Sequence, residues 1–522
     1  MKLRVCIPTA GTGSRLGSLV KNINKSLVSV NNKPTISHQI EYFPKDTEFV
    51  IPLGYKGDLV KKYLLIAHPH IKFYFVNVND YTSPNSGLGL SILKAKKYLQ
   101  QPFIFLSCDT LISGKIPKLK NNWMGYSQLK DMKEYRTISI KGNLVESINE
   151  KKIIKKNIHP YIGIAGIVDY KNFWKKMTDG NQNAIQIGES YGLKELITNK
   201  VYSKKFKWFD TGNLTELSKT RKKLRLSNMP NILEKEDEAI WFVKNKVIKF
   251  SQDRKFIKNR ILRIKYLNNH VPKITAYNDN MYIYNKIEGP VLSQIIDLST
   301  FKKFLIHSDK FWVKKNLNKH EEKKFLLSCN KFYKIKTYER IELFYKKFNK
   351  KDKNENINGK AVPFLHEILD QIDWNLICAG KASRFHGDFH FENIIYNKKI
   401  EKFTFLDWRQ DFDGNIEYGD IYYDLAKLLH GMLVSHSIIN KNKYSVSWDK
   451  RNIHYKIGRK KNLIICEKYF YQWLQKKGFD VNKVKTLTAL IFLNIAPLHH
   501  EPYCRALYAL GKDMLFKVAN NN

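Results

Sequence analysis

The sequence predicts an α/β protein with two domains. The first is built on a mostly parallel sheet, and the second is an α+β domain with a small sheet-containing lobe and a larger helical lobe. Three observations support this prediction. The length of 522 residues exceeds what a single hydrophobic core usually organises. Strand and helix signals alternate in the first part of the chain, and helix signals dominate from Leu292 onward.

The first part alternates short apolar segments with amphipathic ones. We expect strands at residues 3–8, 48–53, 71–78 and 103–107, and helices at 34–42, 56–67 and 88–99. Strands that alternate with helices form a mostly parallel sheet covered on both faces, and ligands then bind at the carboxyl ends of the strands.

A polar, proline-containing stretch at residues 227–231 interrupts this alternation, directly after a basic helix expected at 216–225. It indicates a linker at 227–235 between domains at 1–226 and 236–522. The second domain should begin with strands at 239–244, 246–250 and 281–286 and a helix at 253–268, followed by helices and two further strands at 394–396 and 403–406.

Composition places the chain among globular proteins, with 43% hydrophobic and 13% aromatic residues. Its apolar runs are too short to span a bilayer, and the N-terminus has no signal-peptide pattern, so we expect a cytoplasmic protein. The six cysteines show no paired spacing, which fits a reducing compartment.

The formal net charge of +43 invites a nucleic-acid interpretation. The lysines are spread over both halves, however, and no nucleic-acid-binding motif accompanies them, so we predict no nucleic-acid partner. Attraction to anionic substrates or anionic membrane surfaces is compatible with this charge.

A glycine-rich loop, Gly11-Thr12-Gly13-Ser14-Arg15-Leu16-Gly17, follows the first strand. Such a turn exposes backbone N–H groups to a triphosphate, and its glycines permit close approach. We predict nucleotide contacts from the loop residues Ala10, Gly11, Thr12 and Gly13. Arg15 can pair with the β- and γ-phosphates through its fork of donors.

This loop resembles that of the nucleotidyltransferases that activate sugar phosphates and phosphocholine, which implies a Rossmann-like domain. Their motif continues with a Pro-Lys pair, and here Asn24 stands in place of the proline. Lys25 matches the lysine that contacts the phosphates in that family. With Arg15, it is expected to be catalytic.

Two aspartates match later elements of the same family. Asp109 ends the segment Phe105-Leu106-Ser107-Cys108-Asp109, in which Cys108 replaces a common glycine, and Asp210 lies in Trp208-Phe209-Asp210-Thr211-Gly212. The chemistry requires two carboxylates to hold Mg²⁺ against the nucleotide phosphates, and we predict these two as metal ligands.

The resemblance also implies residues that recognise the base and the acceptor. Ser86 and Gly87 lie in Asn85-Ser86-Gly87-Leu88-Gly89, which resembles the family's base-reading segment. The pair Glu150-Lys151 resembles a family Glu-Lys that contacts the acceptor phosphate or sugar. In so lysine-rich a chain this pair is close to chance.

The second domain contains His386-Gly387-Asp388 followed by Asn393, and then Leu406-Asp407-Trp408. This is the spacing of a catalytic loop for γ-phosphoryl transfer. Asp388 would accept or orient the substrate hydroxyl proton, while Asn393 and Asp407 would hold Mg²⁺.

The string resembles the aminoglycoside phosphotransferase and choline kinase family, which implies a bilobal protein-kinase-like fold. In this family pattern Asp424 is expected to brace the loop, and His390 is expected to pack. Lys249 is the candidate nucleotide lysine, although the helix at 253–268 has no glutamate to pair with it. Glu288 is expected at the interlobe hinge that binds adenine.

Arg409 stands where many relatives carry an acidic residue suited to a cationic substrate. It therefore favours a neutral or anionic alcohol, such as a sugar, as the bound substrate. An alternative is that Arg409 pairs with Asp411 or Asp413.

The two motif sets predict a bifunctional enzyme that uses Mg²⁺, ATP and either CTP or UTP. One site would phosphorylate a small alcohol or sugar, and the other would attach a nucleotide to that phosphate, giving an activated donor for surface polysaccharide. Two alternatives remain: a nucleotidyltransferase whose kinase-like domain only binds or regulates, and a non-enzymatic basic scaffold.

Overall fold

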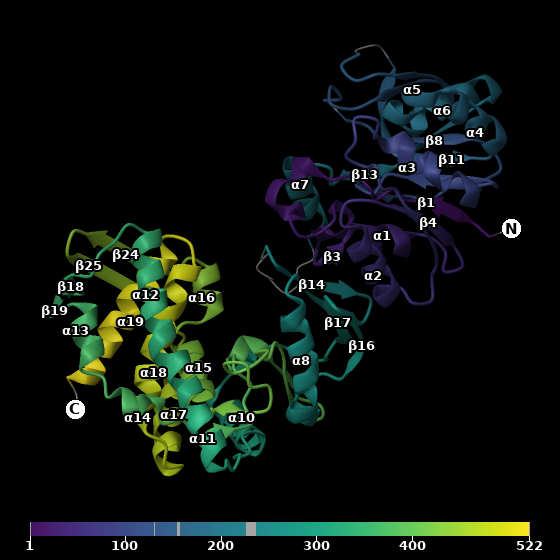
Figure 1. The fold of residues 1–522 in the computed structure, drawn as a ribbon. Helices are drawn as coiled ribbons and strands as arrows, with labels where there is room; N and C mark the ends of the chain where they lie inside the picture. Colours follow the sequence, from purple (N-terminus) through teal and green to yellow (C-terminus); the bar gives the residue numbers. More distant parts are fainter. Residues whose placement is uncertain (1, 130, 154–156, 226–235, 521–522) are drawn as a thin grey trace. The chain divides into compact units, whose positions relative to one another are not determined.

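The computed structural model describes residues 2–129, 131–153, 157–225 and 236–520, which form two compact units. The first unit runs to Arg254 and includes Thr275–Tyr284, and the second comprises Lys255–Ile274 and the chain from Asn285 onward (Figure 1). The predicted linker at 227–235 lies outside the described residues, so the domain boundary at that point stays a prediction.

A nine-stranded sheet forms the centre of the first unit. Its strands, in spatial order, are β5 (Lys72–Asn77), β4 (Glu48–Leu53), β1 (Arg4–Cys6), β6 (Phe103–Leu106), β11 (Ile158–Ile167), β8 (Trp123–Tyr126), β12 (Tyr202–Lys205), β10 (Leu144–Asn149) and β9 (Thr137–Lys141). The strands expected at 3–8, 48–53, 71–78 and 103–107 are β1, β4, β5 and β6, and they pair in parallel.

The sheet as a whole is mixed, which corrects the expectation of a mostly parallel one. β11 runs antiparallel to both β6 and β8, and β10 runs antiparallel to β9 and β12. The reason is connectivity: between β6 and the helix α4 (Tyr170–Asp179) the described chain forms strands and turns but no helix. Parallel neighbours need a long crossover, usually helical, whereas hairpins and turns join antiparallel strands.

Helices cover both faces of the parallel half. α1 (Thr35–Tyr42) and α2 (Gly57–Ala67) lie on one side, and α3 (Leu88–Ala95), α4 and α6 (Glu189–Leu196) lie on the other (Figure 1). Successive residues of β1 point to opposite faces, so Val5 packs in the core beneath α1 and α2, and Cys6 packs in the core beneath α3 and α4. Burial on both faces explains why all six residues of β4 are buried.

A four-stranded sheet follows the expected linker, in the order β14 (Glu238–Val243), β15 (Lys246–Ser251), β17 (Met281–Asn285) and β16 (Ile274–Asn278). β16 had no clear sequence signal. Trp241 of β14 is fully buried against Tyr63 of α2, with ring centroids 5.0 Å apart. The apolar face of this sheet therefore belongs to the same core as α1 and α2.

The second unit is mainly helical. Its largest helices are α8 (Arg254–Leu267), α10 (Leu298–Phe311), α11 (Lys319–Asn330), α12 (Lys336–Lys347), α15 (Ile421–Leu433), α17 (Lys461–Lys476), α18 (Val481–Ile495) and α19 (Tyr503–Ala519). The expected strands at 394–396 and 403–406 are the hairpin of β21 (Ile394–Asn397) and β22 (Lys402–Phe405).

A second sheet in this unit was not predicted. It has the order β19 (Lys360–Val362), β18 (Glu355–Ile357), β25 (Asn452–Ile457) and β24 (Tyr444–Asp449). β18 and β19 have only three residues each, and every second residue of β24 is exposed. None of these three strands therefore has the continuous apolar run by which buried strands are recognised in a sequence.

All six cysteines are free and buried, in agreement with their unpaired spacing. Within the part of the chain that the structure describes, none of the helices combines the length and apolar composition needed to cross a bilayer.

We predict that Trp241→Ala destabilises the first unit by about 3–5 kcal/mol, because it leaves a large cavity in the core that joins the two sheets. Calorimetry should show one unfolding transition moving to lower temperature. Tyr277→Ala, on the same sheet but at a side chain that is 65% exposed, is the matched control and should change that midpoint little. Equal effects of the two substitutions would contradict the shared core.

Candidate functional site

The glycine-rich loop lies between β1 and the 3-10 helix η1 (Ser14–Val20). Gly13 has a φ of 71°, and a Cβ at this position would stand 2.8 Å from Cβ of Lys25. Gly54 approaches the loop from the other side, where a Cβ would stand 2.6 Å from the carbonyl oxygen of Ala10. Side chains are thus excluded at both contacts, and the backbone from Ala10 to Gly13 is held against its neighbours.

Asn24, at the position where the family has proline, is fully buried. Its Nδ2 donates to the carbonyl oxygens of Thr9 (2.8 Å) and Tyr55 (2.6 Å), and its Oδ1 accepts from the backbone N–H of Ser26 (2.9 Å). These three hydrogen bonds fix the start of the turn at Lys25.

Strand pairing brings the two predicted metal ligands together. β7 (Thr110–Ser113) and β13 (Lys207–Asp210) form a two-stranded antiparallel sheet in which Asp210 is opposite Thr110. Asp109 directly precedes β7. Thr211 completes the connection, because its backbone N–H (3.0 Å) and its hydroxyl (2.9 Å) both donate to the carbonyl oxygen of Asp109.

The side chains of Asp109, Asp210 and Arg15 converge on Gly212. A Cβ on this glycine would lie 3.1 Å from Oδ1 of Asp210, 3.3 Å from Oδ2 of Asp109 and 3.6 Å from Nη2 of Arg15. Lys25 joins the group, since its Nζ lies 3.2 Å from Oδ2 of Asp109. The structure thus gathers four of the predicted residues at one point.

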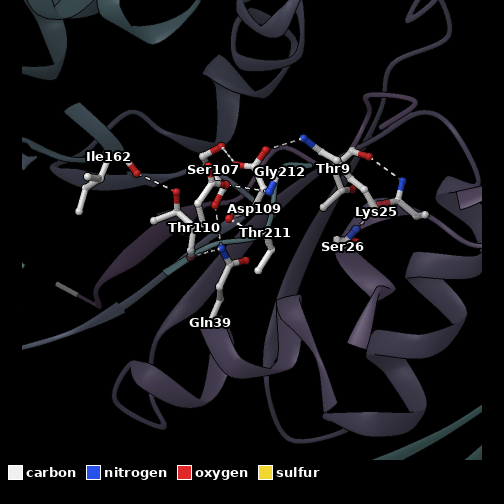
Figure 2. Close-up of polar contacts among 12 residues, drawn as sticks. Thr9, Lys25, Ser26, Gln39, Ser107, Asp109, Thr110, Ile162, Thr211 and Gly212 are labelled. Carbon is white, nitrogen blue, oxygen red and sulfur yellow. Dashed lines mark hydrogen bonds and ion pairs between the residues drawn. The ribbon is translucent and has the colours of Figure 1, made fainter. Parts of the chain in front are cut away.

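Hydrogen bonds orient both carboxylates. The hydroxyl of Ser107 donates to Oδ1 of Asp109 (2.6 Å), as Figure 2 shows beside Thr211 and Gly212. The backbone N–H of Gly212 (2.7 Å) and the hydroxyl of Tyr135 (2.9 Å) donate to the two oxygens of Asp210. Gln39, also drawn in Figure 2, anchors the strand end by donating to the carbonyl oxygen of Ser107 (2.7 Å).

The two carboxylates titrate differently. Burial opposes the charge of Asp109, but Lys25 and the hydroxyl of Ser107 overcome it and lower its pKa to about 2. Burial, together with the negative charge of Asp109, raises the pKa of Asp210 above its ordinary value. Like charges held close together in a partly desolvated site repel each other.

This arrangement suits a hard divalent cation. The donors are carboxylate oxygens, which Mg²⁺ prefers, and the repulsion between Asp109 and Asp210 is what a bound cation would relieve. In the described residues no group of three or more His, Cys, Asp or Glu side chains could enclose a metal by itself. A pair of carboxylates fits a Mg²⁺ that takes its remaining ligands from phosphate and water.

The predicted base-reading segment precedes α3. Gly87 is the residue before this helix, and a Cβ on it would stand 2.3 Å from the carbonyl oxygen of Ile185, in α5 (Asn181–Ile187). Gly89 is equally constrained by the carbonyl oxygen of Ala184. Close packing of α3 on α5 thus accounts for two glycines of this motif. Ser86 is partly exposed beside them.

Glu150 forms ion pairs with two basic side chains. Its carboxylate accepts from Nε of Arg136 (3.0 Å) and Nζ of Lys194 (3.2 Å), and Arg136 also donates to the hydroxyl of Ser190 (3.0 Å). Lys151 is exposed. The roles of Glu150 and Lys151 toward an acceptor stay predictions.

Sequence reasoning missed three polar residues of this site: Ser107, Tyr135 and Arg136. Ser107 was detectable, since it lies two residues before Asp109 in the matched segment. Tyr135 and Arg136 lie between strands in a stretch without a motif, so only the tertiary structure connects them with Asp210 and Glu150.

In the second unit, Asp388 lies in a dense polar network. Its carboxylate is 2.8 Å from Nζ of Lys427, 3.4 Å from Nε2 of His390, and accepts from Nδ2 of Asn393 (2.9 Å). Burial opposes the charge of Asp388, but Lys427 and His390 hold its pKa well below its ordinary value. His390 is buried, as expected of a packing residue, and also pairs with Asp388.

Asp424 braces the loop, as expected. Its two carboxylate oxygens accept from the backbone N–H groups of His386 (2.7 Å) and Gly387 (2.7 Å), and Oδ2 also accepts from Nε1 of Trp312 (3.0 Å). Burial raises its pKa to about 6. A buried carboxylate with three donors fixes the backbone immediately before Asp388.

Asp407 follows β22 with a φ of 57°, a left-handed conformation that few residues other than glycine adopt. The neighbouring backbones are joined, since the N–H of Leu406 donates to the carbonyl oxygen of Asn393 (2.7 Å). Nη1 of Arg260 in α8 lies 3.5 Å from Oδ1 of Asp407. The segments that contain Asn393 and Asp407 are therefore adjacent.

Lys249 is buried in β15 of the first unit, and Glu288 is exposed in the second. Their nucleotide-binding roles stay predictions. Arg409 forms no ion pair with either candidate partner in the described part of the chain: Asp413 is 3.7 Å from Lys331, and Asp411 accepts from Asn259 (3.3 Å).

No family model matches the chain. It is 26% identical over 163 residues to D-glycero-α-D-manno-heptose 1-phosphate guanylyltransferase of Campylobacter jejuni, covering 30% of this chain and 72% of that protein. It is 24% identical over 238 residues to the bifunctional protein GlmU of Methanococcus vannielii, covering 43% and 55% of the two chains. A probable glucose-1-phosphate cytidylyltransferase of Bacillus subtilis is 27% identical over 121 residues, covering 23% and 45%.

Among solved structures, UDP-glucose pyrophosphorylase complexed with UDP-glucose is 18% identical, covering 43% of this chain and 98% of that one, with a TM-score of 0.36. CTP:phosphocholine cytidylyltransferase from Streptococcus pneumoniae is also 18% identical, covering 43% and 100%, with a TM-score of 0.35. The N-terminal part of the chain is therefore similar in sequence to sugar-phosphate nucleotidyltransferases.

We predict that Gly212→Ala lowers nucleotidyl transfer by at least 10-fold, because its methyl group would lie within 3.3 Å of both carboxylates. Mg²⁺ titrations of the rate should show a raised half-saturation concentration. Glu146→Ala, at an exposed side chain of β10, is the control. A normal Mg²⁺ dependence in a folded Gly212→Ala protein would contradict the proposed metal position.

We also predict that Asn24→Ala destabilises the first unit by about 1–3 kcal/mol, because its loss leaves buried backbone groups of Thr9, Tyr55 and Ser26 unpaired. The Michaelis constant for the nucleotide should rise as Lys25 loses its support. Calorimetry and initial rates measure the two effects. Unchanged values of both would show that Asn24 does not fix the loop.

Proposed function

We propose that the first unit is a nucleotidyltransferase that joins a nucleoside monophosphate from CTP or UTP to a sugar phosphate or related phosphate monoester. The main supporting observation is that Asp109, Asp210 and Arg15 converge on Gly212, with Lys25 paired to Asp109. Asp109 follows β6, one of the strands that pair in parallel. The guanylyl- and cytidylyltransferase names of the relatives support the reaction class and leave the base open.

In the proposed reaction the phosphate monoester attacks the α-phosphorus of the triphosphate, and pyrophosphate leaves. Bound Mg²⁺ would supply charge neutralisation at the phosphates. The backbone N–H groups of Gly11–Gly13 would hold the triphosphate, and Arg15 would pair with its outer phosphates. Lys25, whose pKa is raised by Asp109 against the effect of burial, keeps its positive charge at neutral pH.

We further propose that the second unit is a kinase that forms the phosphate monoester from ATP and a small alcohol or sugar. Support comes from the arrangement around Asp388, where Asp424 fixes the loop and Asn393 contacts the carboxylate. Because the pKa of Asp388 lies well below its ordinary value, Asp388 would orient the hydroxyl and stay ionised rather than act as a strong base.

A second candidate function is a nucleotidyltransferase whose second unit only binds or regulates. Its specific support is that Asp388 and Asp407 already pair with cations, Lys427 and Arg260. A kinase would need both carboxylates turned toward substrate and metal. ADP formation measured with a panel of alcohols separates the two candidates.

The most direct test is to incubate the protein with each of the four ribonucleoside triphosphates and a panel of sugar 1-phosphates and phosphocholine. Mass spectrometry would identify the nucleotide-linked product, and a coupled assay would quantify pyrophosphate. Product with CTP or UTP is expected. Absence of pyrophosphate release with every pair would contradict the proposal.

We predict that Asp109→Asn lowers nucleotidyl transfer by about 100-fold or more, the usual size for loss of a group that balances charge in the transition state. Asp388→Asn should abolish ADP formation and leave nucleotidyl transfer to a supplied phosphate intact. The two variants therefore control for each other. Loss of both activities in either folded variant would refute independent sites.

A further inference from the structure

Four cationic side chains gather beside the Asp388 loop, and we call them the Phe332 cationic cluster. Its members come from three separate segments: Lys336 and Arg340 of α12, Arg409 after β22, and Lys427 of α15. Two of them, Lys336 and Arg409, lie over Phe332, which is part of a short π-helix, η6 (Lys331–Ile335). Interruptions of this kind are frequent at functional sites.

Two members share one aromatic ring. Nζ of Lys336 lies 4.4 Å from the ring centroid of Phe332, and the guanidinium carbon of Arg409 lies 4.7 Å from the same centroid. Both cations are within the range of a cation–π contact. The two side chains therefore share one aromatic contact.

The backbone ties Arg409 to the Asp388 loop. Its N–H donates to the carbonyl oxygen of His386 (2.9 Å). Gly387, with a φ of 87°, leaves room for the stem of Arg409, because a Cβ on this glycine would stand 2.5 Å from Cβ of Arg409. The stem of Arg409 is therefore packed against the residue that precedes Asp388.

Positive charge in this cluster exceeds negative charge. Lys427 pairs with Asp388, whereas Lys336, Arg340 and Arg409 form no ion pair in the described part of the chain. Nε of Arg409 is buried without a hydrogen-bond partner. Burial, followed by the charges of Arg409, Arg340 and Lys427, lowers the pKa of Lys336 to about 7, and Glu339, the acid that opposes this shift, is itself exposed.

Such an arrangement is unfavourable without an anion. Cations held close together and partly removed from water are stable only when a counter-charge compensates them. Two arginines and a lysine that would be fully protonated when an anion binds match a phosphate dianion, whose oxygens accept several charge-assisted hydrogen bonds. The cluster also disfavours a quaternary ammonium or aminoglycoside substrate, by direct repulsion.

We propose that the Phe332 cationic cluster binds a phosphate group carried by the alcohol that the second unit phosphorylates. The substrate would then have two ends, a hydroxyl facing Asp388 and an existing phosphate held by Arg409 and Lys336. Calling this molecule a substrate rests on the proposed kinase function of the second unit. The phosphate site itself rests on the cluster alone.

The test measures binding first, on the full-length protein. Inorganic phosphate is titrated against wild type, Arg409→Gln, Lys336→Gln and the exposed-lysine control Lys323→Gln, with ³¹P line broadening as the readout. Phosphate affinity should fall at least 10-fold in each of the first two variants and stay unchanged in the control. Arg409→Lys should recover part of the affinity, and melting curves check that each variant is folded.

The second measurement is ADP formation with glucose 6-phosphate and glycerol 3-phosphate, compared with glucose and glycerol. Arg409→Gln should raise the Michaelis constant for a phosphorylated acceptor at least 10-fold with a small effect on kcat. Phosphate binding that depends on Arg409, with no ADP from any alcohol, would support the site and refute the kinase. Phosphate affinity unaffected by Arg409→Gln and Lys336→Gln, or a loss confined to MgATP, would overturn the proposed site.

Discussion

Repulsion between two partly buried carboxylates is the constraint on which the N-terminal site depends. Asp109 and Asp210 are about a hundred positions apart in the sequence. Both carboxylates lie beside Gly212, which has no side chain to occupy the space between them. The pairing of β7 with β13 holds them there, and Ser107, Tyr135 and the N–H of Gly212 fix their orientation. Because hydrogen bonds hold two anionic side chains close together, a divalent cation bound between them would relieve their repulsion.

The surrounding elements explain how the chain maintains this arrangement. The tight contact of Gly13 with Lys25 and the buried Asn24 place a lysine next to Asp109, which lowers the pKa of one carboxylate and leaves the other raised. In the second unit, buried hydrogen bonds and a paired lysine likewise orient a carboxylate and keep it charged. Asp424 fixes a backbone turn and Lys427 keeps Asp388 ionised. Three further basic side chains have no acidic ion-pair partner among the described residues.

Much of this was predictable from local sequence. The strands and helices up to residue 107 and the loop motifs could be predicted, because each depends on residues that are close together in the sequence. What escaped prediction depends on long-range contacts. The antiparallel half of the main sheet follows from a missing crossover helix, the core shared by Trp241 and Tyr63 joins distant segments, and Tyr135 carries no motif. The encounter of Lys336 with Arg409 over Phe332 likewise has no signal in sequence.

The central claim is that Asp109 and Asp210 bind one divalent cation together with a nucleoside triphosphate. Electron paramagnetic resonance of Mn²⁺, titrated into the full-length protein with a non-hydrolysable CTP or UTP analogue, tests it most directly. We expect one tight nucleotide-dependent Mn²⁺ site that is lost in Asp210→Asn and retained in Asp388→Asn. An Mn²⁺ affinity that is the same in wild type and Asp210→Asn would contradict the account.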